Sequence, residues 1–154
     1  MALTNDGAAD APEWAVDPAT EEGTALLEQL AAEIPGTVAI AVVHAHERRI
    51  LGFYRAYESL QPSAIGEALY HLAGSALEAI QGLGGAGLFG DVEDGIMVTA
   101  SAAIHYRLVG ADRASILLAD RPAAPSQTDA NRRILTAYDD RFIATFPAGA
   151  SPST

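Results

Sequence analysis

The apolar residues near the start of the chain are spaced as in an amphipathic helix. Leucine or isoleucine recurs every four residues from Leu26 to Ile34, and the pair Pro35-Gly36 follows as a stop signal. Asp17-Pro18 resembles an N-cap followed by proline at the first helical position. We therefore expect a first helix over about residues 17–34.

Two further helices are expected later in the chain. Ser63 is placed to cap a helix that runs to about Leu83, and Ser126 with Asp129 three residues on resembles a capping box. The helix after Ser126 carries one apolar stripe. Its members are Ile134, Leu135, Tyr138, Phe142 and Phe146.

Five segments have the composition or alternation of strands. "TVAIAVV" (37–43) is short and β-branched, and "RRILGFYRAY" (48–57) is its expected hairpin partner across the link 45–47. In "AIHYRLV" (103–109), Ile104, Tyr106 and Leu108 alternate with His105 and Arg107. The other two segments are 96–101 and 114–119.

The expected element order is therefore α-β-β-α-β-β-β-α, in one α+β domain over residues 17–146. Residues 1–16 are small, acidic and aperiodic, and are expected to form a flexible arm; residues 147–154 are expected to form a flexible tail. Trp14, within the arm, either packs onto the domain or awaits a partner, and we favour packing.

The second expected helix is apolar on more than one side. At 100° per residue, its apolar positions cover nearly twice the sector of somewhat over 100° that an ordinary surface helix buries. Such a helix usually contacts both its own sheet and a second body, so we predict a homodimer. Leu77 and Tyr70 lie towards the flank and are the expected contacts across it. The alternative is that Ala and Gly count as neutral and that Leu77 is an ordinary exposed leucine.

Charge and composition exclude several classes of partner. The chain has 154 residues and a net charge of −11, and its 9 basic residues are all arginine. It offers little from which to build the cationic face that binds nucleic acid or an anionic membrane. With no cysteine there is neither a disulfide framework nor thiol catalysis. The start of the chain lacks the pattern of a signal peptide, and its longest apolar run is too short to span a bilayer, so we expect a soluble cytoplasmic protein without membrane insertion.

No motif in the sequence indicates catalysis or a cofactor. "GLGGAG" (82–87) matches the dinucleotide fingerprint, but it follows a helix and leads towards a strand, whereas that fingerprint follows a strand and opens a helix. His44 and His46, with His71 or His105, form only a weak metal pattern, and "DVED" (91–94) fits a solvated loop. We therefore expect no enzyme, no cofactor and no metal.

The chain resembles the roadblock / dynein light chain family over about residues 24–146. The resemblance rests on "LLEQLAAEIPGTVAIAVV", on "AIGEALYHLAGSALEAIQGL", on "HYRLVGADRASILLA" and on the element order. It implies a profilin-like, five-stranded antiparallel sheet with the second helix on one face and the two terminal helices on the other. The turn at 45–47 and the segment "DANRRIL" depart from patterns common in the family.

The resemblance also implies a homodimer built from the second helix and the neighbouring strand at the sheet edge, which would cover an otherwise open edge. The expected interface residues are Leu69, Tyr70, Ala73, Leu77, Ile96 and Val98. Bacterial relatives commonly regulate a Ras-like small GTPase, some as GTPase-activating proteins, and others are scaffolds. The leading hypothesis is thus a non-enzymatic regulatory or scaffold homodimer that binds a Ras-like small GTPase.

A small-molecule sensor is the alternative. A pocket between helix and sheet, lined by convergent polar groups such as His105 and Arg107, would favour it.

Overall fold

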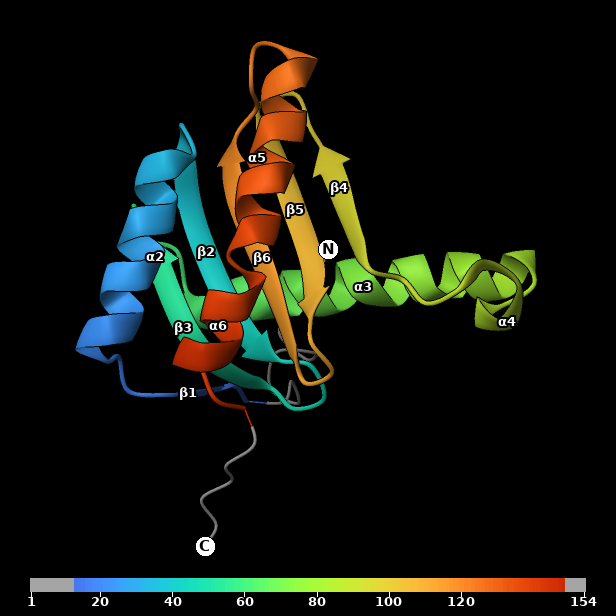
Figure 1. Ribbon diagram of the computed structural model, residues 1–154, viewed down its shortest axis with the longest axis horizontal. Coiled ribbons are helices and arrows are strands. Elements are labelled where there is room, and N and C mark those ends of the chain that lie inside the picture. The colour runs from blue at the N-terminus through green and yellow to red at the C-terminus, as the bar shows by residue number, and fades with distance from the viewer. Residues whose placement is uncertain (1–12, 149–154) are drawn as a thin grey trace, which may run out of the picture.

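A single six-stranded sheet organises the computed structural model, which describes residues 13–148 (Figure 1). The strand order is β1-β3-β2-β6-β5-β4. The strands are β1 (Ala15–Val16), β2 (Thr37–His44), β3 (Arg49–Arg55), β4 (Asp94–Val98), β5 (Ala102–Val109) and β6 (Arg113–Asp120). The helices are α2 (Glu21–Glu33), α3 (Pro62–Leu83), α4 (Ala86–Phe89), α5 (Pro125–Ala137) and α6 (Asp139–Thr145).

The expectation of five antiparallel strands is wrong by one short strand, because β1 adds to the sheet parallel to β3. The amide of Ala15 donates to Arg48 O and the amide of Asp17 donates to Ile50 O, each at 2.9 Å. Asp17 also binds the guanidinium of Arg49 at 2.9 Å. With that carboxylate engaged, the N-cap of α2 is Thr20 instead, whose hydroxyl accepts from the amide of Gly23.

The ends of the chain extend the domain slightly beyond the expected bounds of 17 and 146. Residues 14–16, which the sequence analysis assigned to the arm, contact the sheet or α3, and Ala148, assigned to the tail, is buried. The rest of the expected arm and tail, residues 1–12 and 149–154, lies outside the described residues.

The element order also differs from the expected one at two helices. The last helix is divided at Tyr138 into α5 and α6. Two residues before the break, the hydroxyl of Thr136 donates to Arg132 O at 2.8 Å, a back-bond of the kind that bends helices. The other addition is α4, a single turn between α3 and β4 that the sequence analysis treated as part of a loop.

The third predicted strand, 96–101, is displaced towards the N-terminus and forms β4 at 94–98. Thr99 ends it, because its hydroxyl accepts from the amide of Ala102 at 3.0 Å and closes a tight turn before β5.

Helices cover both faces of the sheet, as expected: α2, α5 and α6 lie on one face and α3 on the other (Figure 1). The first core joins leucines of α2 to Tyr138, Phe142 and Phe146. The second core joins Ile65 and Leu69 of α3 to the opposite face of β2 and β6. The alternation predicted for β5 is confirmed, since Ile104 and Tyr106 pack into the α3 core while His105 is buried on the other face.

Candidate protein-interaction surface

Strand β4 is an open edge of the sheet. In the described part of the chain it pairs only with β5, through the register Asp94↔Arg107 to Val98↔Ala103. Its apolar side chains are exposed: Ile96 by 39%, Met97 by 43% and Val98 by 50%. An edge strand with unpaired backbone groups and exposed apolar side chains is a template for pairing with another chain.

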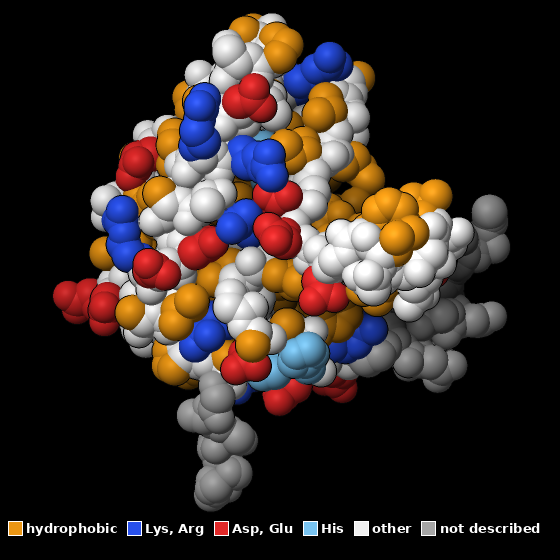
Figure 2. All heavy atoms as spheres, turned by 45° about the vertical axis from the view of Figure 1, so that its right-hand side comes forward, with side chains coloured by type: hydrophobic (Ala, Val, Ile, Leu, Met, Phe, Trp, Pro, Cys, Tyr) orange, Lys and Arg blue, Asp and Glu red, His pale blue; other side chains and the backbone are white. Residues whose placement is uncertain are grey.

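Helix α3 extends beyond this edge (Figure 1). Its buried residues Ile65, Gly66 and Leu69 all lie in its first half, where the sheet supports it. In the second half Leu77 is 48% exposed and Leu83 is 65% exposed. Figure 2 shows hydrophobic side chains gathered at the free end of this helix. The overhang and the β4 edge lie next to each other, and we call the two together the α3–β4 surface. Met97 points to the α3 side of the sheet, whereas Ile96 and Val98 point to the side that α5 covers.

The six residues expected at a dimer interface differ in how exposed they are. Leu77 is exposed on the overhang, and Ile96 and Val98 are exposed on the β4 edge, where they point to the α5 side of the sheet. Ala73 is half-buried on the same helix as Leu77, and Tyr70 is half-buried with its ring against that of Trp14. Leu69 is 2% exposed and packs into the chain's own core.

Trp14 packs onto the first half of α3, as the favoured reading predicted. Its indole nitrogen donates to Glu67 Oε2 at 2.9 Å, and its ring meets that of Tyr70 edge-on at 5.1 Å. The ring lies so close to Gly66 that a Cβ there would come within 2.6 Å of it. Arg48 lies over both rings and pairs with Glu67. This cluster fixes the supported half of α3 and leaves the overhanging half free.

Four more exposed apolar residues belong to the α3–β4 surface and were not predicted from the sequence: Leu83, Leu88, Phe89 and Met97. For Leu88 and Phe89 the sequence did contain a signal. "LF" stands between glycines in "GLGGAGLFG", and a loop that only crosses to the next strand has no need of two large apolar residues.

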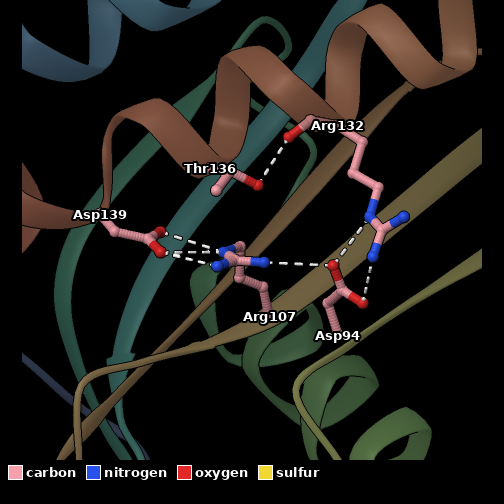
Figure 3. A network of polar contacts seen from close by, with 5 residues as sticks. All are labelled: Asp94, Arg107, Arg132, Thr136 and Asp139. Atoms are coloured by element: carbon pink, nitrogen blue, oxygen red, sulfur yellow. Dashed lines mark hydrogen bonds and ion pairs between the residues drawn. The ribbon is translucent and has the colours of Figure 1, made fainter.

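A polar network anchors β4 to the helices on the opposite face (Figure 3). Arg107 of β5 donates to Asp139 of α6 at 2.8 Å and to Asp94 of β4 at 3.1 Å. Arg132 of α5 binds the same Asp94 through two nitrogens, at 2.9 and 3.0 Å. Its hydrogen bonds with Asp139 raise the pKa of Arg107 above the usual arginine value. The two positive charges of the arginines are thus balanced by two carboxylates, and the network joins β4, β5, α5 and α6.

His105 lies beneath α5 without a polar partner. Its side chain is buried, and neither ring nitrogen has a hydrogen-bond partner among the described residues. Burial lowers its pKa from the usual value, and the nearby charge of Arg132 lowers it further against the opposing effect of Asp94. The neutral imidazole is therefore the form that the fold accommodates.

This burial predicts a pH-dependent contribution to stability. Because the folded-state pKa is below the unfolded value of about 6.5, the contribution is complete above pH 6.5 and is lost as the pH falls below it. Between pH 7 and 5, the free energy of unfolding of the wild type should fall relative to that of His105→Leu, by at most about 1.4 kcal/mol per pH unit. Urea denaturation at each pH measures this difference.

The matched control is His71→Gln, because the side chain of His71 is 81% exposed. Its stability should follow that of the wild type at each pH. A His105→Leu curve parallel to that of the wild type would show that the histidine takes up a proton in the fold at no cost.

The other candidate chemical groups stay apart in the structure. His44 Nδ1 accepts from the amide of His46 at 3.1 Å, while His71 lies beside Glu67 on α3. Within residues 13–148, no three His, Asp or Glu side chains are grouped so that they could hold a metal ion. The glycine loop follows helix α3, and the helix that it opens is only the single turn α4, so the strand–loop–helix context of the dinucleotide fingerprint is not met.

The polar groups that would favour a sensor do not converge on a ligand pocket. The hollow lined by both His105 and Arg107 has no room for a water molecule. A larger groove, of about 420 Å³, lies on the α3 face, but its walls are mainly apolar. The structure therefore supplies no observation that favours the sensor.

In the described part of the chain, none of the helices has the length and apolar character that crossing a membrane requires.

No protein-family model matches the chain, and no curated protein sequence does either. Solved structures do match it. MglB of Myxococcus xanthus has a TM-score of 0.61 at 14% identity, with 90% of this chain and 99% of MglB covered. An MglB described as having a tetrameric arrangement has a TM-score of 0.60 at 13% identity, with 84% and 95% covered.

A Roadblock/LC7 domain from Streptomyces avermitilis has a TM-score of 0.55 at 14% identity, with 77% of this chain and 95% of the domain covered. These similarities span nearly the whole of each solved chain. The sheet with α3 on one face and the terminal helices on the other is therefore the roadblock fold.

Proposed function

We propose that this protein is a non-enzymatic regulatory or scaffold homodimer of the cytoplasm that binds a Ras-like small GTPase. The observation that carries the proposal is the α3–β4 surface, where an apolar helix overhangs its own sheet beside an unpaired strand edge. The similarity to an MglB with a tetrameric arrangement supports self-association within this fold.

A second copy suits this surface because it would both pair the open edge of β4 and cover the exposed apolar half of α3. Antiparallel pairing of two β4 strands would join the sheets and give the edge backbone groups partners. The overhanging half of each α3 would then have the other copy's α3 or sheet beside it, which would bury Leu77 and Met97, the exposed β4 side chain on the α3 side of the sheet.

The GTPase as partner follows from the family resemblance, and the contacts of Arg55 and Arg132 support an indirect mode of action. An arginine finger must be free to reach the γ-phosphate of the GTPase. Arg55 instead donates to the carbonyl oxygens of Glu58 and Leu60, at 3.1 and 2.6 Å, and Arg132 is held by Asp94. If hydrolysis is stimulated, we expect the dimer to brace the switch residues of the GTPase without inserting a side chain.

The test of this function is state-dependent binding. The small GTPase encoded nearest to the gene is loaded with either a GTP analogue or GDP, and its affinity for the protein is measured by calorimetry. We expect tighter binding of the GTP-analogue form by at least about tenfold, which corresponds to about 1.4 kcal/mol.

The control is titration of each loaded GTPase into buffer without this protein, which reports the heat of dilution. Equal affinity for the two states, or no binding to either, would contradict a regulatory role.

A further inference from the structure

The segment between α3 and β4 is an exposed apolar projection. Residues 82–90, "GLGGAGLFG", contain no polar side chain. Leu83, Leu88 and Phe89 are 65%, 68% and 55% exposed. We call residues 83–89 the knob. Its shape depends on Gly84, Gly85 and Gly90, whose φ values of 132°, 93° and 82° are rarely adopted by residues with side chains.

An apolar groove lies on the same face of the molecule as α3. Its volume is about 420 Å³, and its walls are α3, the ends of β5 and β6, and residues 91–92 of the segment between α4 and β4. The apolar residues that line it include Leu69, Ala73, Leu77, Tyr106, Leu108 and Ala114. Two charged residues also reach the groove: Arg107, which Asp139 and Asp94 neutralise, and Asp91. Apart from these two, the walls of the groove are apolar like the knob.

The knob and the groove also lie along one flank of α3. At 100° per residue, Ala73 and Leu77 of the groove share a sector of about 60° with Ile80 and with Gly84 at the start of the knob. The groove lies towards the middle of the helix and the knob lies at its C-terminal end. Two helices that pack antiparallel along this flank, related by a two-fold axis near Ile80, would place each knob beside the other copy's groove.

We infer that the occupant of the groove is the knob of a second copy, with Leu88 and Phe89 of one chain seated between α3 and the β5–β6 end of the other. This inference rests on the proposed homodimer and adds to it an exchanged contact. Two-fold symmetry forms the contact twice, so each copy completes the groove of its partner.

Chemical cross-linking tests this contact directly, because the chain has no native cysteine. Leu88→Cys and Leu108→Cys are made on separate, differently tagged chains, which are mixed under conditions of subunit exchange and treated with a short bis-maleimide reagent. Both positions are exposed, at 68% and 43%, so each variant should keep its fold. We expect a covalent heterodimer of the two tags in high yield.

The matched control pairs Leu88→Cys with Val16→Cys, since Val16 is 53% exposed but lies on β1, at the sheet edge opposite β4. This pair should give at most about a tenth of the cross-linked product. As a second measurement, Leu88→Asp should raise the dimer dissociation constant at least about tenfold.

The outcomes separate this inference from the proposed function. Equal yields for the two pairs, or no 88–108 product although the wild type is a dimer, would overturn the exchange and leave the dimer itself standing. A wild type that is monomeric by light scattering at tens of micromolar would overturn both the exchange and the dimer. GTPase binding is measured separately and does not depend on the cross-link.

Discussion

Replacing Leu77 with glutamate should raise the dissociation constant of the dimer at least about 100-fold. Complete burial of a leucine side chain contributes about 1.5–3 kcal/mol, and about half of this remains to be gained because Leu77 is half-exposed. The two-fold axis counts it twice, and the glutamate adds the cost of burying a charge, so about 3 kcal/mol is at stake. Each 1.4 kcal/mol corresponds to a factor of ten. Because Leu77 is 48% exposed in the single chain, the substitution should leave the fold intact. Sedimentation equilibrium of the wild type and the variant measures the change.

Val16→Glu is the matched control for this prediction. Val16 is apolar, 53% exposed, and placed on β1 at the sheet edge opposite β4, so its replacement should leave the dissociation constant within about threefold. If Leu77→Glu left the dissociation constant unchanged, Leu77 would be an ordinary exposed leucine and the dimer would use another surface.

The two-layer architecture was predictable because local patterns determine it. The β-branched run at 37–43 and the alternation at 103–109 each specify a strand and its buried face, and the four-residue spacing in α2 specifies the helix that covers it. Strand β1 was not predictable in this way. Its two residues have no periodicity of their own, and they join the sheet because Arg49 on β3 holds Asp17 in place.

The candidate site was predictable only in part, for a related reason. The breadth of the apolar sector of α3 indicated that something besides the sheet covers this helix, but it did not show which half of the helix the sheet leaves free. Leu69 is 2% exposed and Leu77 is 48% exposed, because Leu77 lies about two turns further along α3 and about 80° round it, beyond the part of the helix that the sheet supports. The length of a helix relative to the width of its sheet is a tertiary property that no residue spacing encodes.

The polar network around Arg107 could not be predicted from the sequence either. Asp94 appeared there as one of three carboxylates in a solvated loop, and Arg107 as a polar position in an alternating strand. Only the register Asp94↔Arg107, together with the packing of α5 and α6 over the same face, brings these charges within hydrogen-bond distance.

Replacing Arg107 with alanine should lower the free energy of unfolding by about 2–3 kcal/mol. Removing one partner of a fully buried ion pair costs about 3–5 kcal/mol, since the other charge is left without compensation. Here the side chain of Arg107 is 16% exposed and that of Asp139 is 23% exposed, so water relieves part of the cost. Urea denaturation measures the change, and Arg133→Ala, at an exposed arginine on α5 outside this network, is the matched control with an expected change below about 0.5 kcal/mol.

The same substitution should act most strongly on β4, because Asp94 at the start of that strand is held by Arg107 and Arg132 from the opposite layer. Amide hydrogen exchange in β4 should accelerate more in Arg107→Ala than exchange in β2, which has a strand on each side. If β4 forms the edge at which two copies pair, dimerisation should weaken in parallel with this loosening.

Arg107→Lys keeps the charge but cannot bind both carboxylates with a planar fork. Its free energy of unfolding, its amide exchange in β4 and its dimer dissociation constant should therefore all fall between those of the wild type and the alanine variant. Uniform acceleration of exchange across the sheet, with no excess in β4, would show that the network stabilises the fold as a whole and does not hold the edge strand.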